Sequence, residues 1–426
     1  MKKQIVILGG GFGGVYTLKY LHKFFHKRGL RQTERGLTQT SIKLVLVNRK
    51  NYFIFTPLLH EVVTGGVSID NALEPIREII KCCDFDFIHG EVEKINLENK
   101  IVYINKEKEN YKVNYDYLVI ALGSKTNYYN IPGAKEYTFS LKTIDDAIRL
   151  KNHFVHMFEL ASISQSEAAI NKYLTFVIVG GGATGVELAG EMSDLFYKTF
   201  SKFYPPALIS QVKIILVEKG KELIPQFSPK LRQKALERLK KLKVDVRLER
   251  GVVEVGEDFI KLDDGNIIET KTVIWAAGVE PNLPEIIGNV EKDSRGRLVL
   301  NEYLQVKNYN DVFAIGDVCC FIQDQKPLPQ LAQVAVRQAK TVALNIKNSI
   351  ENKPLEKFIY KHTGDLISVG RFYALGEIKG IEFSGLISWF IWKGVYLTKM
   401  ISFRDQVKTF IDWFLNLFLP RDITEL

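Results

Sequence analysis

Two segments of this chain repeat one pattern, and the repetition limits the possible folds more than any other feature of the sequence. In each, a strand rich in β-branched residues runs into a glycine cluster, a helical pattern follows, and an apolar strand then ends at a polar residue. Strand, glycine cluster and returning strand span residues 4–8, 9–14 and 43–48 in the first copy, and residues 175–179, 180–185 and 213–218 in the second. Both copies fit a β-α-β unit with parallel strands. The sequence therefore predicts an α/β fold.

Both glycine clusters have the spacing G-x-G-x-x-G, and each glycine of this spacing has a physical role in a nucleotide-binding turn. One glycine allows the tight turn, one lets the backbone approach a pyrophosphate, and one lets helix and strand pack closely. The amino end of the following helix then offers unpaired N–H groups and a favourable dipole to the phosphates. A single such turn is often purely structural, but two with strand and helix in place favour two Rossmann-like dinucleotide-binding domains. The candidate contacts are Gly9, Gly11, Phe12, Gly13 and Gly14 in the first cluster, and Gly180, Gly182, Thr184 and Gly185 in the second.

The residue that ends each returning strand bears on which nucleotide each site accepts. Glu218 is placed to accept hydrogen bonds from both ribose hydroxyls, and its charge repels a ribose 2′-phosphate, which favours NADH over NADPH. The alternative is an exposed strand-end acid, with Lys219 and Lys221 close enough to help admit a phosphate. The first copy has Asn48 at this position, and an asparagine still bonds a ribose.

Three further strands supply the remaining candidate contacts and define the domain order. A strand over residues 115–122 runs into Gly123, a strand from Val273 ends at Gly278, and a strand from Asp311 ends at Gly316 and Asp317. The simplest architecture inserts the second nucleotide domain into the first. The predicted ranges are 1–135 and 281–380 for the first domain, 136–280 for the second, and 381–426 for a carboxyl-terminal segment.

Composition excludes several classes of protein. The four cysteines of this 426-residue chain include the adjacent pairs Cys82-Cys83 and Cys319-Cys320, which give neither a disulfide framework nor zinc-ligand spacing. We therefore expect no metal site and a reducing compartment. The net charge of +9 attracts any polyanion, but no helix-turn-helix, zinc-finger or aromatic-interleaved basic pattern supports binding of nucleic acid.

The carboxyl-terminal segment has the pattern of an amphipathic helix that lies on a membrane. Its longest uncharged stretch, Phe383–Trp392, is about half of the roughly 20 residues that cross a bilayer. Apolar residues then recur at helical spacing, namely Phe410, Ile411, Phe414, Leu415 and Phe418, with Trp413 and Leu417 widening the stripe. Upstream, Trp389, Trp392 and Lys393 are residue types suited to the headgroup boundary. We expect a peripheral anchor on the cytoplasmic face; the alternatives are packing on the protein's own core or on a second copy in a homodimer.

These motifs resemble the two-dinucleotide-binding flavoproteins, and most closely their type II NADH dehydrogenases, the single-subunit NADH:quinone oxidoreductases. The resemblance covers nearly the whole chain. It rests on the glycine clusters and on segments 51–59, 275–282, 314–317 and 331–335. The family's segment at the flavin and quinone pocket often continues with two glutamines, whereas this chain has Arg337 before Gln338, which leaves the quinone type open.

The resemblance implies a role for each candidate residue. FAD would occupy the first site and NADH the second, with Asp317 bonding the ribityl chain and Thr56 and Pro57 lying near the isoalloxazine. Glu187 would lie near nicotinamide and flavin. Ala332, as a cofactor contact, and Gln333 would lie at the flavin and quinone pocket, where the Gln333 amide would bond a quinone carbonyl. The implied activity is respiratory, non-proton-pumping transfer of hydride from NADH to FAD and of two electrons onward to a membrane quinone.

Other functions remain open from the residues alone. A disulfide reductase of this superfamily needs two cysteines a few residues apart beside the flavin, and the segment after Asn51 has none. A sulfide:quinone reductase also needs separated reactive cysteines, for which Cys319 and Cys320 are the candidates. A ferredoxin reductase-like enzyme fits the fold but leaves the apolar tail unexplained. A flavin-bearing redox sensor is the alternative outside the enzymes.

Overall fold

The computed structural model describes residues 3–25, 42–80, 85–107 and 109–425. Cys82 and Cys83 lie outside the described residues. The chain divides into two units, each assembled from three separate stretches. Unit 1 comprises Met1–Phe53, Leu73–Lys125 and Val279–Lys361, and unit 2 comprises Ile54–Ala72, Thr126–Gly278 and His362–Leu426. The predicted α/β fold class with two Rossmann-like sheets is confirmed.

The first glycine cluster belongs to unit 1, at the carboxyl end of a strand in a parallel sheet of order β22-β9-β1-β2-β5. Strands β1 (Lys3–Leu8) and β2 (Ile42–Asn48) are the pair predicted from the repeat. Their continuous apolar runs are typical of parallel strands that are covered on both faces. The other strands are β5 (Asp86–His89), β9 (Tyr117–Ile120) and β22 (Val312–Ala314).

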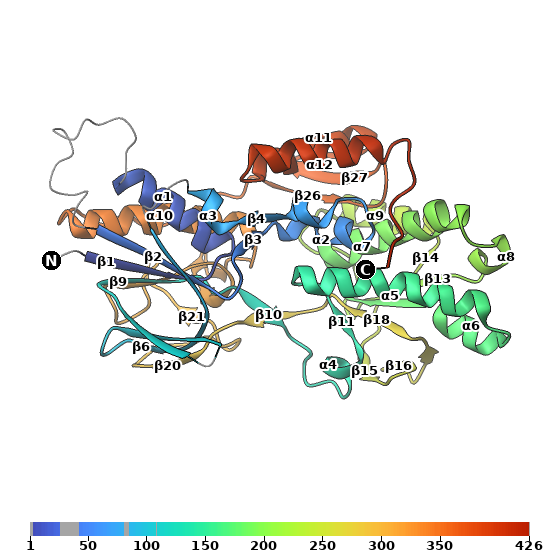
Figure 1. Cartoon of the computed structure of the whole chain (residues 1–426), viewed down its shortest axis with the longest axis horizontal. Helices are drawn as coiled ribbons and strands as arrows, with labels where there is room; N and C mark the ends of the chain where they lie inside the picture. The colour runs from blue at the N-terminus through green and yellow to red at the C-terminus, as the bar shows by residue number, and fades with distance from the viewer. Residues whose placement is uncertain (1–2, 26–41, 81–84, 108, 426) are drawn as a thin grey trace. The chain divides into compact units, whose positions relative to one another are not determined.

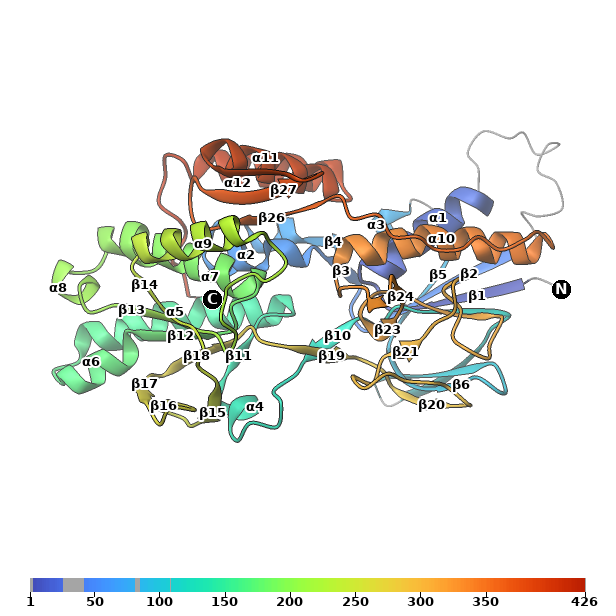
Figure 2. The ribbon, with the colours of Figure 1, turned by 180° about the vertical axis from the view of Figure 1, so that it is seen from behind.

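Side chains along β1 alternate between the two faces of this sheet. Ile5 and Ile7 join a core shared with helices α1 (Phe12–Phe25) and α10 (Ala332–Ile350). Val6 and Leu8 join a second core, against the sheet β20-β6-β7-β8. Figures 1 and 2 show these layers, with α1 and α10 on one face and β6 and β20 on the other. Further elements of this unit are β4 (Leu73–Pro75), α3 (Ile76–Ile79), β6 (Glu91–Asn96), β7 (Ile101–Lys106), β8 (Glu109–Asn114), β19 (Val279–Pro281), β20 (Glu285–Ile287), β21 (Leu298–Val299), η5 (Gly316–Val318), β23 (Cys319–Cys320), β24 (Ile322–Gln323) and β25 (Lys326–Pro327).

The second glycine cluster belongs to unit 2, which has its own parallel sheet of order β11-β18-β12-β13-β14. On one face, Phe176 of β12 packs edge-on against Phe154 of helix α5 (Ile144–Ile163). On the other, Val177 and Val179 join a core with β15, β16 and β17. The sheet strands are β11 (Phe139–Ser140), β12 (Thr175–Val179), β13 (Lys213–Val217), β14 (Val244–Arg247) and β18 (Thr272–Trp275). Around them lie α4 (Ala134–Tyr137), α6 (Glu167–Tyr173), α7 (Ala183–Asp194), η3 (Leu195–Thr199), η4 (Phe200–Lys202), α8 (Pro206–Ile209), α9 (Pro229–Lys241), β15 (Val252–Val255), β16 (Phe259–Leu262) and β17 (Ile267–Glu269).

Unit 2 also contains the carboxyl-terminal residues. Strands β26 (Gly364–Ser368), β27 (Ala374–Ile378) and β28 (Ile381–Gly385) form an antiparallel sheet that leads into helices α11 (Leu386–Lys399) and α12 (Phe403–Leu415). Helix α11 packs against β27, and α12 packs against α11; both helices are red in Figure 1. Among the described residues, no helix combines the length and apolar character needed to cross a membrane.

Candidate active site

In the first glycine turn, some positions have no room for a side chain, and one position borders open space. An added Cβ would lie 1.8 Å from the Gly9 carbonyl oxygen if built on Gly14, and 2.3 Å from the Ala121 carbonyl oxygen if built on Gly9. Gly9 also has a φ of +105°, which other residues rarely adopt. At Gly11, in contrast, a Cβ would meet no atom within 4 Å. The turn therefore leaves room for a phosphate beside the amino end of α1.

Asn48, at the end of β2, is joined to this turn. Its side-chain oxygen accepts a hydrogen bond of 2.9 Å from the Gly10 N–H, and its amide nitrogen donates to the Lys50 carbonyl at 2.8 Å. The side chain thus fixes the turn beside the space where a ribose would follow the phosphate. The predicted ribose bond stays a prediction.

Asp317 follows strand β22 of the same sheet and is held by its own network of hydrogen bonds. The Ser124 hydroxyl donates to its carboxylate at 2.6 Å. The preceding Gly316 has a φ of +74°, and its N–H donates to the side-chain oxygen of Gln338 at 2.8 Å. Gln338 is buried in α10 and was not among the predicted site residues. A buried amide that bonds a backbone N–H fixes the turn from which the Asp317 carboxylate projects.

The other predicted residues of unit 1 lie close to these in the fold. Gly123 follows β9 with a φ of +71°, and a Cβ there would meet no atom within 4 Å. Ala332 and Gln333 are the first residues of α10, a helix that contacts η5. Unit 1 therefore offers a phosphate space at Gly11 and a carboxylate at Asp317, which together fit an FAD. Bound there, FAD would supply the hydride-accepting chemistry.

The second glycine turn, in unit 2, repeats the construction of the first. A Cβ on Gly185 would lie 1.9 Å from the Gly180 carbonyl oxygen, whereas one on Gly182 would meet no atom within 4 Å. Gly180 has a φ of +112°. Thr184 lies in the first turn of α7, directly after the open space. Gly278, three residues beyond β18, has a φ of +71°.

Glu218 has the position in unit 2 that Asn48 has in unit 1. It directly follows β13, whereas Asn48 is the last residue of β2. Its carboxylate accepts hydrogen bonds from the Gly181 N–H at 2.6 Å and from the Gly220 N–H at 2.5 Å. The two turns therefore use the same bond from the second glycine to a strand-end side chain, with a neutral amide in one and an anion in the other. The predicted discrimination by Glu218 against a 2′-phosphate stays a prediction.

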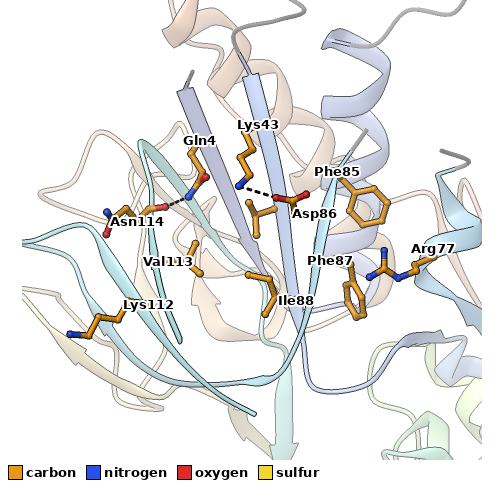
Figure 3. Close-up of a pocket in the computed structure, with 11 residues that line it drawn as sticks. Gln4, Lys43, Arg77, Phe85, Asp86, Phe87, Ile88, Lys112, Val113 and Asn114 are labelled. Carbon is orange, nitrogen blue, oxygen red and sulfur yellow. Dashed lines mark hydrogen bonds and ion pairs between the residues drawn. The ribbon is translucent and has the colours of Figure 1, made fainter. Parts of the chain in front are cut away.

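A separate hollow of about 580 Å³ lies at the opposite, amino ends of the unit 1 strands. Figure 3 shows Gln4, Lys43 and Asp86 at its wall, with Lys43 and Asp86 joined in an ion pair of 2.9 Å. These residues belong to the starts of β1, β2 and β5, whereas the glycine turn follows the carboxyl end of β1. This hollow is therefore not part of the dinucleotide site.

Glu187 lies in unit 2, inside a buried polar cluster. It is only 7% exposed, and its carboxyl accepts a hydrogen bond of 3.2 Å from the Ser368 N–H. The His60 ring lies 3.9 Å away. Burial raises the pKa of Glu187 well above its usual value, and the nearby carboxylates Glu61 and Glu191 raise it further. Burial lowers the pKa of His60, so the environment favours the neutral forms of both groups.

A buried ion pair beside this cluster joins α11 to α2 (Leu59–Val63). The Lys393 ammonium lies 3.2 Å from the Glu61 carboxylate, whose other oxygen accepts from the Trp413 indole. Trp389, Trp392 and Trp413 surround the ammonium, with the Trp413 ring centre 3.7 Å away. Burial lowers the pKa of Lys393 to about 8. Burial alone would raise the pKa of Glu61, but the adjacent ammonium outweighs it, so that pKa is lowered.

The surroundings of these residues correct part of the membrane prediction. The sequence predicts Trp389, Trp392 and Lys393 at a headgroup boundary and Trp413 in the apolar stripe, yet all four are largely or wholly buried inside unit 2. The pattern identified an amphipathic segment but not which side chains fold inward. The predicted stripe residues Phe410, Ile411, Phe414, Leu415, Leu417 and Phe418 are exposed.

The sequence did not predict several polar residues of this cluster. Two of them, His60 and Glu61, lie on α2. The predicted residues Thr56 and Pro57 precede them and begin η1 (Thr56–Leu58) in unit 2. An adjacent histidine and glutamate inside an apolar stretch was the available signal. Nothing in the sequence singles out Ser368.

Comparisons with known proteins agree with this arrangement. The family model described as pyridine nucleotide-disulphide oxidoreductase matches residues 3–339, and the model of the NDH2 C-terminal domain matches residues 362–422. A probable NADH dehydrogenase of Dictyostelium discoideum is 31% identical, over 99% of this chain and 91% of that protein. A type II NADH:quinone oxidoreductase of Mycobacterium tuberculosis is 31% identical, over 97% of this chain and 87% of its own length.

A solved structure supports the same fold. NDH2 from Plasmodium falciparum, solved in complex with NADH, matches with a TM-score of 0.90 and 22% identity, covering 100% of both chains. With a family model over residues 3–339 and relatives at 31% identity along nearly its whole length, the chain belongs to the pyridine nucleotide-disulphide oxidoreductase family and, within it, to the type II NADH dehydrogenases.

Proposed function

We propose that this chain transfers hydride from NADH to FAD and passes two electrons onward to a membrane quinone, without pumping protons. The chain is an oxidoreductase of the NADH:quinone class, with FAD as cofactor and NADH as substrate. The observation that carries the proposal is the pair of glycine turns, each with an open space for phosphate, of which only the second ends in a carboxylate. The family resemblance implies FAD in unit 1 and NADH in unit 2, and the Asp317 and Glu218 carboxylates support this assignment.

The cysteines argue against a sulfide:quinone reductase. Cys319 and Cys320 are both buried, and burial raises the pKa of Cys319 to about 12 and raises that of Cys320. A thiol with a raised pKa is a poor nucleophile, because the thiolate is the reactive form. The two residues are also adjacent in β23, without the spacing that disulfide exchange needs.

Gln333 supports the proposal as the contact for the quinone. In Gln333→Ala, we expect slower flavin reoxidation by a short-chain quinone and an unchanged rate of flavin reduction by NADH, because only the bond to the quinone carbonyl is lost. Rapid-mixing spectroscopy of the two half-reactions separates these rates. If flavin reduction slows more than reoxidation, Gln333 does not serve the quinone.

Glu218 supports NADH as the preferred donor. In Glu218→Gln, we expect the ratio of kcat/KM for NADH to that for NADPH to narrow, since the neutral amide no longer repels a 2′-phosphate. Steady-state assays with both nucleotides measure the ratio. Replacing Asn48 with aspartate is the matched control in unit 1 and should leave the ratio unchanged. An unaltered ratio in Glu218→Gln contradicts the assignment.

The carboxyl-terminal helices form the surface that we propose binds the membrane. Along α12 and just beyond it, Phe410, Phe414 and Phe418 are 57%, 52% and 72% exposed, on a helix that also carries Arg404 and Lys408. Such a helix lies in the headgroup plane without crossing. A quinone dissolved in the bilayer then has a short path to the enzyme. The free thiols Cys319 and Cys320 fit a reducing compartment, which favours the cytoplasmic face.

Substitution tests this surface better than truncation, because removing α11 and α12 also removes Lys393 and Trp413, the partners of Glu61. In Phe414→Asp/Phe418→Asp, we expect loss from membrane pellets with FAD still bound. Flotation with liposomes measures binding, and Ile163→Asp, at a site 78% exposed on α5, is the control. Retention on liposomes contradicts the anchor. If sedimentation shows the double variant dissociating from a dimer instead, a second copy of this chain covers the surface.

A further inference from the structure

The segment that follows α12 carries a charged side chain, Arg421, that is largely buried. After α12, the tail Pro420–Glu425 has no helix or strand, and most of its residues are exposed or partly exposed. The Arg421 side chain is only 12% exposed, and its guanidinium lies 2.6 Å from the Glu191 carboxylate on α7. It also donates to the Thr64 carbonyl oxygen at 3.4 Å.

The chain makes room for this tail at two consecutive glycines. A Cβ on Gly65 would lie 2.9 Å from the Asp422 carbonyl oxygen, and one on Gly66 would lie 3.7 Å from the guanidinium carbon of Arg421. Gly65 also has a φ of +68°. The Asp422 carboxylate pairs with Lys151 of α5 at 2.8 Å. The tail is therefore seated between the turn at Thr64 and helices α5 and α7.

The partner of Arg421 lies one helical turn from Glu187. Glu191 follows Glu187 by four residues on α7, so the two carboxyls lie on one face of the helix. Glu191 is itself only 3% exposed. Burying a carboxylate this deeply costs free energy unless a cation pairs with it. Among the ion pairs of the described residues, Arg421 is the cation that pairs with Glu191. The other charged or titratable groups around this site are Glu187, Asp194, His60, Glu61, Lys393 and Arg371.

We propose that Arg421 is a positioning residue for hydride transfer, because it neutralises Glu191 and thereby fixes α7, with Glu187, against the turn at Thr64. The inference rests on the proposed function and on the place near nicotinamide and flavin that the family resemblance implies for Glu187. The tail thus completes the surroundings of that carboxyl. Without the guanidinium, the Glu191 carboxylate would remain buried with no cation paired to it, which destabilises the packing of α7.

The test uses the full chain, loaded with FAD, as Arg421→Met, Arg421→Lys and Arg421→Met/Glu191→Gln. In Arg421→Met we expect about tenfold slower flavin reduction by NADH, because α7 is no longer held in place and Glu187 moves from its position. The melting temperature of Arg421→Met should also fall, because removing one partner of a buried ion pair leaves the other charge uncompensated.

Two comparisons keep this test decisive. In the double variant, Glu191→Gln removes the uncompensated charge and should restore most of the rate and of the melting temperature, which would not happen if Arg421 acted only through packing. Arg421→Lys should retain most of both, and Glu425→Gln, with a side chain 47% exposed, should match the wild type. No rescue by Glu191→Gln, or an unchanged rate of flavin reduction in Arg421→Met, overturns the proposal. If the wild type itself is not reduced by NADH, the proposed function fails, while the melting data still test the Arg421–Glu191 pair.

Discussion

Replacing Gly14 with alanine should yield protein without FAD, and replacing Gly185 with alanine should yield protein with FAD that NADH no longer reduces. The added Cβ would lie 1.8 Å and 1.9 Å from a carbonyl oxygen in the two turns, far inside contact distance. The backbone must move in each case, so the N–H groups at the amino end of the helix no longer point at the phosphates. The ratio of flavin to protein absorbance measures the first effect, and anaerobic titration with NADH measures the second.

The open glycines give the matched controls. Alanine at Gly11 or Gly182 would contact no protein atom within 4 Å, so the turns should fold normally. The added methyl group would instead occupy the space assigned to a pyrophosphate, and nucleotide affinity should fall while the melting temperature of the protein without nucleotide stays unchanged. Normal FAD content in Gly14→Ala, or normal nucleotide affinity in Gly11→Ala and Gly182→Ala, contradicts the assignment of these turns.

Lys393→Met should destabilise the protein by about 3–5 kcal/mol, the usual cost when one partner of a buried ion pair is removed. The Glu61 carboxylate would remain buried with the Trp413 indole but without its ammonium. Urea unfolding measures the change in free energy. Tryptophan fluorescence reports on the same place, because three of the chain's four tryptophans surround Lys393.

The double variant Glu61→Gln/Lys393→Met distinguishes a lost charge pair from lost packing. Neutral glutamine still accepts from the Trp413 indole, so most of the stability should return if the unpaired carboxylate causes the loss. Lys213→Met, at an exposed lysine on β13, should change the free energy of unfolding by less than about 0.5 kcal/mol. A loss of similar size in the double variant and in Lys393→Met would show that the ammonium matters only through its contacts with the rings.

Sequence reasoning succeeded where structure is local. A glycine turn, the strand before it and the helix after it lie within about 20 residues. The spacing of the glycines reflects the tight turn, the approach of a phosphate and the close packing of helix and strand, so it can be recognised in the sequence. The pairing of Gly181 with Glu218 follows from the same unit, because β12 and β13 are neighbours. The fold class and the family were predictable for this reason.

The buried polar cluster was not predictable in the same way. Glu61 and Trp413 are separated by 352 residues, and no periodicity within α12 tells which of its apolar side chains will turn inward. Asp412 likewise accepts hydrogen bonds from the distant Ser68 N–H and Asn71 amide. These partners can be identified only once α12 is placed against α2 and η2 (Ile69–Ala72).

The assembly of unit 2 from distant stretches has a consequence for biosynthesis. The stretch from Ile54 to Ala72 is synthesised 332 to 357 residues before its partners Lys393, Asp412, Trp413 and Arg421. Chains fold progressively from the amino end during synthesis. The buried cluster around Glu187 therefore cannot close until these later residues have left the ribosome, whereas the strand and helix beside each glycine turn are complete much earlier. A nascent chain would then have both glycine turns before it has the surroundings of Glu187.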